Sequence, residues 1–148
     1  MQTAASIARY IVRFFQQVGD PISNLKLQKL LYYCQGWHLA LRDTPLFQDR
    51  LEAWVHGPVQ PGVYGTYKYN RWSSITEDVA EADLTPEEKS VIADVLAVYG
   101  TDSGYELELR THAEPPWLHA RGNIPTDEES HTVISQPTMA AFFRTQMQ

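Results

Sequence analysis

Apolar residues near the start of the chain recur every three or four positions, the spacing of a helix with one buried face. This pattern predicts a first helix over about 3–18, which ends at the Gly-Asp-Pro break at 19–21. A second helix is predicted from Ser23 or Asn24, both favourable N-caps, to about Leu41. Its apolar stripe consists of Leu27, Leu30, Leu31, Cys34, His38 and Leu41.

The middle of the chain predicts shorter elements. The apolar run 51–55 predicts a strand that ends at Gly57-Pro58. Pro61 then opens a predicted short helix. A polar loop follows it, and a second short strand is expected around Ile75.

The second half contains two capping patterns. The Thr-Pro-Glu-Glu run at 85–88 predicts a helix that stops at Gly100. A Ser-x-x-Glu pattern at 103–106 predicts a short helix to about Thr111. Pro115-Pro116 prevents its continuation, so the segment up to Trp117 is expected to be irregular.

The C-terminal part predicts a loop over 122–129, a last strand at Val133-Ile134 and a terminal helix that begins at Ser135 or Thr138. These elements together predict a mainly α (α+β) fold, a compact helical bundle with a small antiparallel sheet of short strands. The length of 148 residues fits one domain, which we expect to span residues 1–148.

Composition and charge narrow the function classes. The single cysteine, Cys34, excludes a disulfide framework, and no apolar run is long enough to cross a membrane, so we expect a cytoplasmic protein without a membrane partner. The net charge is −6, but residues 1–72 carry eight basic and four acidic residues (+4), whereas residues 73–148 carry four and fourteen (−10). An acidic half favours a basic partner over nucleic acid, but a solvated acidic surface that aids solubility is the safer explanation.

Two segments place a Trp beside Gly or Pro in an irregular region: 51–59 with Trp54, and 111–117 with Trp117. Aromatic side chains on Pro-braced loops suit a rigid protein-binding surface. The alternative is that both rings fill the core beneath the loops.

Other chemistry is weakly supported, and we expect no catalytic residues, no metal and no cofactor. A metal-assisted hydrolase would have to use His112, Glu114 and His119, which two prolines interrupt. A DNA-binding regulator would rest on the basic N-terminal half, where only Lys26 and Lys29 suit a recognition helix. Both remain alternatives to a protein-binding function.

Several segments, taken in order, resemble the SocA-like (Panacea) antitoxin domain of phage and prophage regions. They are Leu-Gln-Lys-Leu-Leu-Tyr at 27–32, Pro-Leu-Phe at 45–47, Glu-Ala-Trp at 52–54, Gly-Pro-Val at 57–59, Val-Tyr at 63–64, Leu107, Thr-His at 111–112, Glu114, Pro-Trp at 116–117, Ile-Ser at 134–135 and Phe-Phe at 142–143. The resemblance covers most of the chain. It departs at Glu108, where a small hydroxyl residue is expected.

The resemblance implies a bacterial antitoxin rather than an enzyme, one that neutralises a cognate protein toxin by direct binding. At least one similar protein acts as an adaptor that delivers its toxin to a protease, so a protease is a second implied partner. The residues that we expect at the partner-binding surface are Lys26, Lys29, Trp54, His56, Tyr64, His112, Glu114 and Trp117.

Overall fold

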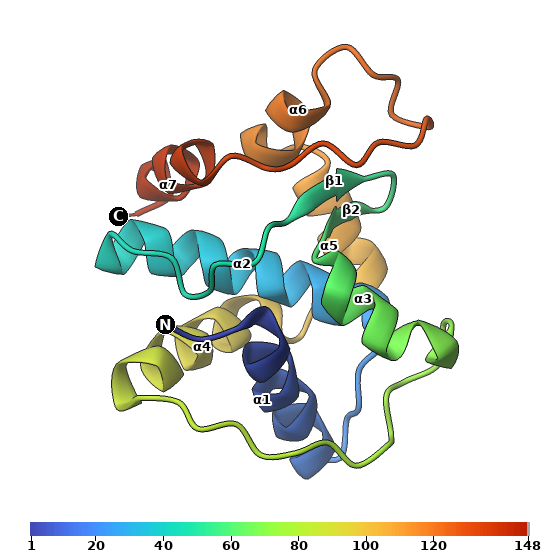
Figure 1. Cartoon of the computed structure of the whole chain (residues 1–148), viewed down its shortest axis with the longest axis vertical. Coiled ribbons are helices and arrows are strands. Elements are labelled where there is room, and N and C mark those ends of the chain that lie inside the picture. The colour runs from blue at the N-terminus through green and yellow to red at the C-terminus, as the bar shows by residue number, and fades with distance from the viewer. Residues whose placement is uncertain (148) are drawn as a thin grey trace.

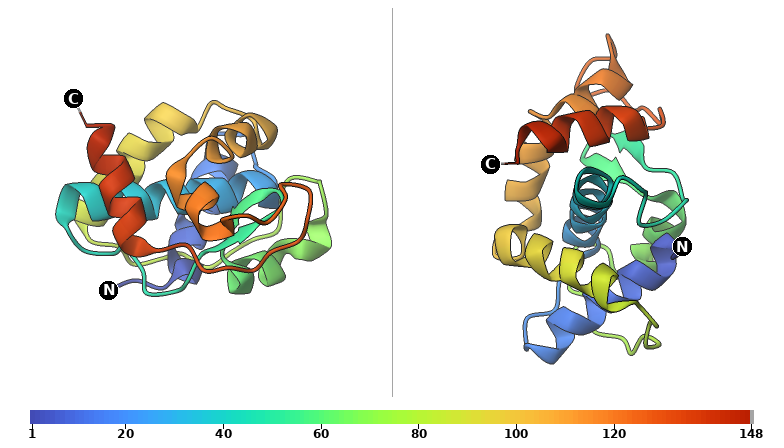
Figure 2. Two further views of the ribbon diagram at one scale, coloured as in Figure 1. Left: turned by 90° about the horizontal axis from the view of Figure 1, so that it is seen from above. Right: turned by 90° about the vertical axis from the view of Figure 1, so that its left-hand side faces the viewer.

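One helix runs through the middle of the molecule and the other elements surround it. In this computed structural model, which describes residues 1–147, the central helix is α2 (Asn24–Arg42). Figure 2 shows α2 almost end-on, with helices and the hairpin on every side. It contacts α1 (Ala4–Gln17), α3 (Pro61–Tyr67), α4 (Pro86–Tyr99), α5 (Gly104–Thr111), α7 (Gln136–Thr145) and strand β2 (Gly57–Val59).

Every α2 residue from Lys26 to Gly36 is buried, including its polar residues. Each polar side chain there has a partner in the core. Gln35 donates to Phe47 O at 2.8 Å and accepts from Leu46 N at 2.7 Å, which holds the chain after α2 against the helix. These internal bonds offset the cost of removing polar groups from water.

The sheet is a single hairpin in the described residues. Strand β1 (Glu52–Trp54) pairs antiparallel with β2, and Glu52 lies opposite Val59. The strand predicted over 51–55 does end before Gly57, but the return strand was missed: Gly57 has a φ of +105° and begins β2. Pro58 lies opposite Ala53 and is buried, and its carbonyl accepts from the Lys29 ammonium, although proline has no N–H to donate to the ladder.

The strands expected around Ile75 and at Val133-Ile134 are absent from the described residues. Ser74 forms one isolated bridge with Ser23, and Val133 forms one with Glu52. The C-terminal loop nevertheless extends the hairpin, since Ala53 N donates to Thr132 O at 2.9 Å and Ile134 N donates to Leu51 O at 2.8 Å.

The helices agree closely with their capping patterns. Thr85 and Ser103 form complete capping boxes at the starts of α4 and α5, and Ser135 caps α7. The exception is the Pro115-Pro116 pair, which opens helix α6 (Pro115–Arg121) instead of leaving an irregular loop. Proline fits the first turn of a helix because its missing N–H has no intrahelical partner there.

The architecture is mainly α with a small two-stranded antiparallel sheet, as the sequence predicts. In Figure 1 the hairpin, α3 and α5 gather at one end of α2, while α7 lies across its other half. A short 3-10 helix, η1 (Lys68–Asn70), continues α3 and leads into a long loop that runs past α1 to the start of α4 (Figure 1).

Candidate functional site

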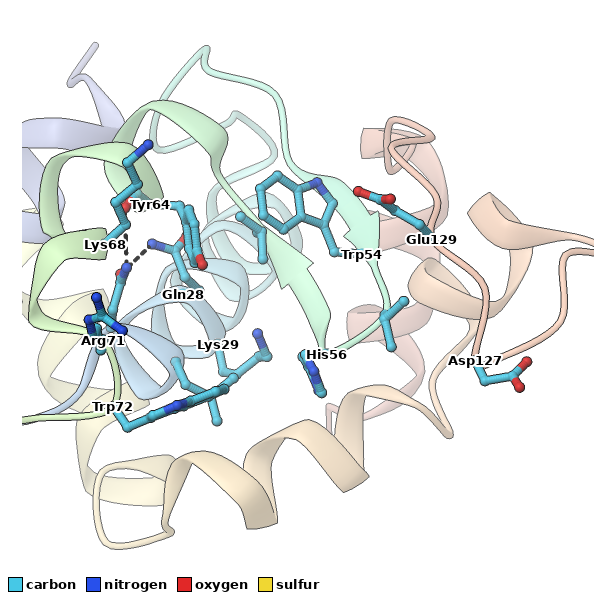
Figure 3. A pocket seen from close by; sticks show the side chains of 14 residues that line it. Gln28, Lys29, Trp54, His56, Tyr64, Lys68, Arg71, Trp72, Asp127 and Glu129 are labelled. Atoms are coloured by element: carbon cyan, nitrogen blue, oxygen red, sulfur yellow. Dashed lines mark hydrogen bonds between the residues drawn. The ribbon is translucent and has the colours of Figure 1, made fainter.

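A groove of about 580 Å³ opens between the hairpin, the α3–η1 segment and the first turns of α2. Its side chains come from segments far apart in the sequence, and Figure 3 shows them facing a common space. The lining residues are Asn24, Leu25, Gln28, Lys29, Trp54, Val55, His56, Val59, Tyr64, Lys68, Arg71, Trp72, Asp127 and Glu129. Lys29, Trp54, His56 and Tyr64 are among the residues expected from the sequence at a partner surface.

Trp54 forms part of the wall of the groove and is held in place from two sides. Its ring lies edge-on to Tyr64 and to His131, each with centroids 5.1 Å apart. Its indole N–H donates to Glu52 Oε1 at 2.9 Å. The ring is half-buried, so one face is fixed by the fold and the rest borders the groove.

Glu52 is an anchor for this wall. Burial acts to raise the pKa of its carboxyl, but hydrogen bonds from Trp54, Arg50 and His131 outweigh it and hold the pKa below the usual value. An ionised acceptor strengthens the bond that orients the Trp54 ring.

Lys29 lies at the base of the groove with a fully buried side chain. Its ammonium donates to Pro58 O at 3.1 Å, and burial lowers its pKa to about 7, opposed by the charge of Glu108. Gly57 leaves room for this side chain, because a Cβ there would lie 2.6 Å from Lys29 Cε. The lysine therefore ties α2 to β2 and offers little surface to a partner.

Lys26 does not line the groove. It is buried, and its ammonium donates to Gly100 O at 2.6 Å at the end of α4. Burial lowers its pKa as well. Because α2 is enclosed on all sides, it presents no face that could enter the major groove of DNA.

His56 is exposed at the turn of the hairpin, with Nδ1 3.1 Å from Glu108 Oε2 on α5. Glu108 is the position at which the sequence departs from the Panacea pattern. Here its carboxylate lies near both His56 and the buried Lys29.

The remaining expected residues do not line the groove: His112 ends α5, Glu114 precedes α6, and Trp117 lies in α6. The Glu114 carboxylate accepts hydrogen bonds from the hydroxyls of Tyr32 at 2.9 Å and Tyr33 at 3.0 Å. Burial raises the pKa of Glu114 to about 7, although the tyrosine hydrogen bonds act to lower it. This residue links the start of α6 to the middle of α2.

Trp117 is buried, and its indole N–H donates to Trp54 O at 2.8 Å. Its ring stacks on His112 with centroids 4.1 Å apart, and burial lowers the pKa of that histidine. Trp54 and Trp117 thus have different environments. Trp117 fills the core, as the alternative reading held, while Trp54 borders the groove.

The metal-assisted hydrolase alternative requires a cluster of metal-binding side chains. Within residues 1–147, no group of three or more His, Cys, Asp and Glu could hold a metal ion. Glu114 is engaged by the two tyrosines, and His119 is exposed on α6.

Lys68, Arg71, Trp72, Asp127 and Glu129 line the groove but were not expected from the sequence. Trp72 is the clearest omission, since 79% of its side chain is exposed. The signal in the sequence is a large aromatic residue inside the polar run 70–74, where no apolar neighbour predicts burial.

None of the helices among the described residues is both long and apolar enough to cross a membrane.

Comparison with known proteins gives one family. Residues 27–118 match the model described as "Antitoxin SocA-like, Panacea domain". The chain is also 32% identical over 127 residues to "Antitoxin SocA" of Caulobacter vibrioides, an alignment that covers 77% of this chain and 68% of the relative. No solved structure matches significantly. The matched region contains the hairpin, α3 and most of the groove, and the chain belongs to the SocA-like Panacea antitoxin family.

Proposed function

We propose that this protein is a cytoplasmic antitoxin, a single domain over residues 1–148, that neutralises a partner toxin by binding it directly. Family membership supports the antitoxin role. The observation that carries direct binding is the groove, in which the partly exposed Trp54 and the exposed Trp72 border a space open to a partner. Tryptophans at the edge of a concave surface are frequent centres of protein–protein binding energy.

The groove is better suited to binding than to catalysis. Lys29 at the base of the groove and Glu114 outside it, whose pKa values burial moves to about 7, are engaged by internal partners. A catalytic acid or base needs hydrogen-bond reach to a substrate atom. Here those groups connect α2 to β2 and to α6, so the groove keeps a fixed shape for a partner. We therefore propose a non-enzymatic mechanism in which the bound antitoxin covers a functional surface of the toxin.

Co-expression with the product of the adjacent gene tests the proposal. We expect that product to arrest growth alone, the pair to grow, and the two proteins to elute as one complex in size-exclusion chromatography. The interface should bury at least about 1,000 Å² in total. An adjacent product that is harmless alone, or one that stays toxic without forming a complex, would contradict the proposal.

The amount of toxin in these cells distinguishes two modes of neutralisation. If the antitoxin covers the toxin, toxin levels stay constant while growth recovers. If it acts as an adaptor for a protease, toxin levels fall, and recovery depends on that protease.

A further inference from the structure

The two ends of the groove carry opposite charge. Lys68 and Arg71 lie at one end and Asp127 and Glu129 at the other, with aromatic side chains between them (Figure 3). Among the described residues, neither Lys68 nor Arg71 has a carboxylate partner within 4.0 Å, and Asp127 has no cationic one. Glu129 is 3.0 Å from His131 Nε2, also at the surface. The groove therefore has one basic and one acidic end, and most of these charged side chains are free to bind a partner.

The backbone at the basic end is in an unfavourable conformation. Arg71 has φ 56° and ψ −120°, a region that residues with a Cβ rarely occupy. Such a residue costs on the order of 1–3 kcal/mol and is found mainly at functional sites. The turn is fixed by local bonds, with Arg71 N donating to Lys68 O at 3.0 Å and Ser73 N to Asn70 O at 3.0 Å.

This turn places Trp72 beside the groove. In Figure 3 the indole lies along the rim near Lys29, and it is among the most exposed large apolar side chains of the described residues. Two unfavourable features thus coincide at one turn, a strained backbone and an exposed tryptophan. Both are explained if a partner covers the indole.

We propose that the groove binds an extended segment of the toxin with an acidic side chain at one end, an apolar side chain in the middle and a basic side chain at the other end. The acidic group pairs with Lys68 and Arg71, the apolar group packs between Trp72 and the Trp54–Tyr64 pair, and the basic group meets Asp127 and Glu129. A nucleic acid does not present acidic, apolar and basic groups in this order. The acidic end of the groove and the net charge of −6 also repel it. This inference rests on the antitoxin function proposed above and specifies the chemistry that the antitoxin recognises.

Trp72→Ala tests the aromatic anchor in a binding measurement between purified antitoxin and the toxin encoded beside it. Removal of a central interface tryptophan weakens binding by about 30-fold or more. Tyr105→Ala is the matched control, because Tyr105 is 64% exposed on α5 and does not line the groove. Equal affinities for wild type, Trp72→Ala and Tyr105→Ala would overturn the role of Trp72.

Charge reversal tests the two ends. We expect Lys68→Glu with Arg71→Glu, and separately Asp127→Lys with Glu129→Lys, to weaken binding at least tenfold at low salt and to reduce its salt dependence. Reversal of the exposed Arg42 and Lys89 outside the groove is the control and should leave affinity within about twofold. A matching acidic-to-lysine change in the toxin should restore binding to the Lys68/Arg71 double variant.

Arg71→Gly separates binding from folding. Glycine tolerates the φ of 56°, so this variant should unfold at a higher temperature, on the order of 2 °C, while it binds the toxin less tightly. If Arg71 only shapes the turn, the variant should still unfold at a higher temperature but bind the toxin as tightly as wild type, and that result would contradict the proposal.

The outcomes keep the two proposals apart. If the wild type binds and neutralises the toxin but all groove variants behave like their controls, the antitoxin function stands and the groove is not the binding surface. If the wild type neither binds nor neutralises it, the proposed function fails, and the groove inference fails with it.

Discussion

Two ionisable groups of opposite charge are removed from water at the central helix, Lys29 within α2 and the half-buried Glu114 at the start of α6. Burial moves the pKa of each to about 7, downward for the lysine and upward for the carboxyl. Each makes hydrogen bonds to its neighbours, Lys29 to Pro58 O and Glu114 to two tyrosine hydroxyls. Stability near neutral pH should therefore depend on the protonation of these two groups.

We expect Glu114→Gln to change the pH dependence of stability. The folded-state pKa of Glu114 is raised from 4.5 to about 7, so between those values the folded protein holds a proton that the unfolded chain has lost. The wild-type free energy of unfolding therefore falls as pH rises through this window, by at most about 1.4 kcal/mol per pH unit. Glutamine still accepts from the tyrosines but does not titrate.

Urea unfolding of both proteins at several pH values between 4.5 and 7 measures this difference. The slope of wild type minus variant should be negative. Parallel curves for the two proteins would show that Glu114 titrates normally.

The sequence predicts the groove residues unevenly, and the reasons are physical. Trp54 and Tyr64 are found because they flank Gly and Pro, which fix the local backbone. Lys26 and Lys29 looked like exposed contacts because lysine is rarely buried, and only the tertiary partners Gly100 and Pro58 make their burial possible. The exposure of Trp72 depends on a turn conformation that no local sequence pattern predicts.

At the scale of elements, the packing of α7 on α2 depends on Gly36. An added Cβ there would lie 2.1 Å from Phe143 Cε2, so the two helices approach as closely as they do only because this position has no side chain. The Phe143 ring also lies against Tyr32, Tyr33 and Trp37. The contact thus organises an aromatic cluster between the two helices.

We expect Gly36→Ala to destabilise the protein by about 1–3 kcal/mol, because the overpacked methyl group displaces Phe143. Gly65→Ala in α3 is the matched control. A Cβ there meets nothing within 4 Å, so alanine should stabilise by up to about 1 kcal/mol through helix propensity alone. Thermal unfolding of the two variants should show shifts of opposite sign, and a gain for both would disprove the close contact.

Elements with a single local interpretation were predicted well. The capping boxes at Thr85 and Ser103 each indicate only the start of a helix, and α4 and α5 begin there. Proline is an ambiguous signal, because it can end one element or begin the next. Pro58 and Pro116 were read only as stops; β1 and α5 do end before them, but the two prolines also lie in β2 and in the first turn of α6. Only contacts with distant segments distinguish the two cases.

At the scale of the whole molecule, α2 is the core and every described layer packs on it directly or through a neighbour. Its burial on all sides is not visible in the sequence, because Lys, Gln and Tyr interrupt the apolar positions. The apolar stripe predicts one buried face of α2. Its other faces are buried as well, because their polar side chains have hydrogen-bond partners inside the protein.

We expect one cooperative unfolding transition, as the proposed single domain requires. Far-UV circular dichroism follows all helices, whereas tryptophan fluorescence follows the environments of Trp37, Trp54, Trp72 and Trp117. Because α2 links these regions, both signals should give the same midpoint in urea. Two separated midpoints would indicate independently folding parts.

The central position of α2 also has a consequence for protein synthesis. The ribosome completes α2 at Arg42, but its cover includes α7, which begins only at Gln136. At about 5–20 residues per second, several seconds pass between the two events. During this interval the nascent chain exposes part of its future core, so newly made molecules are open to chaperones and proteases until the last helix has been translated.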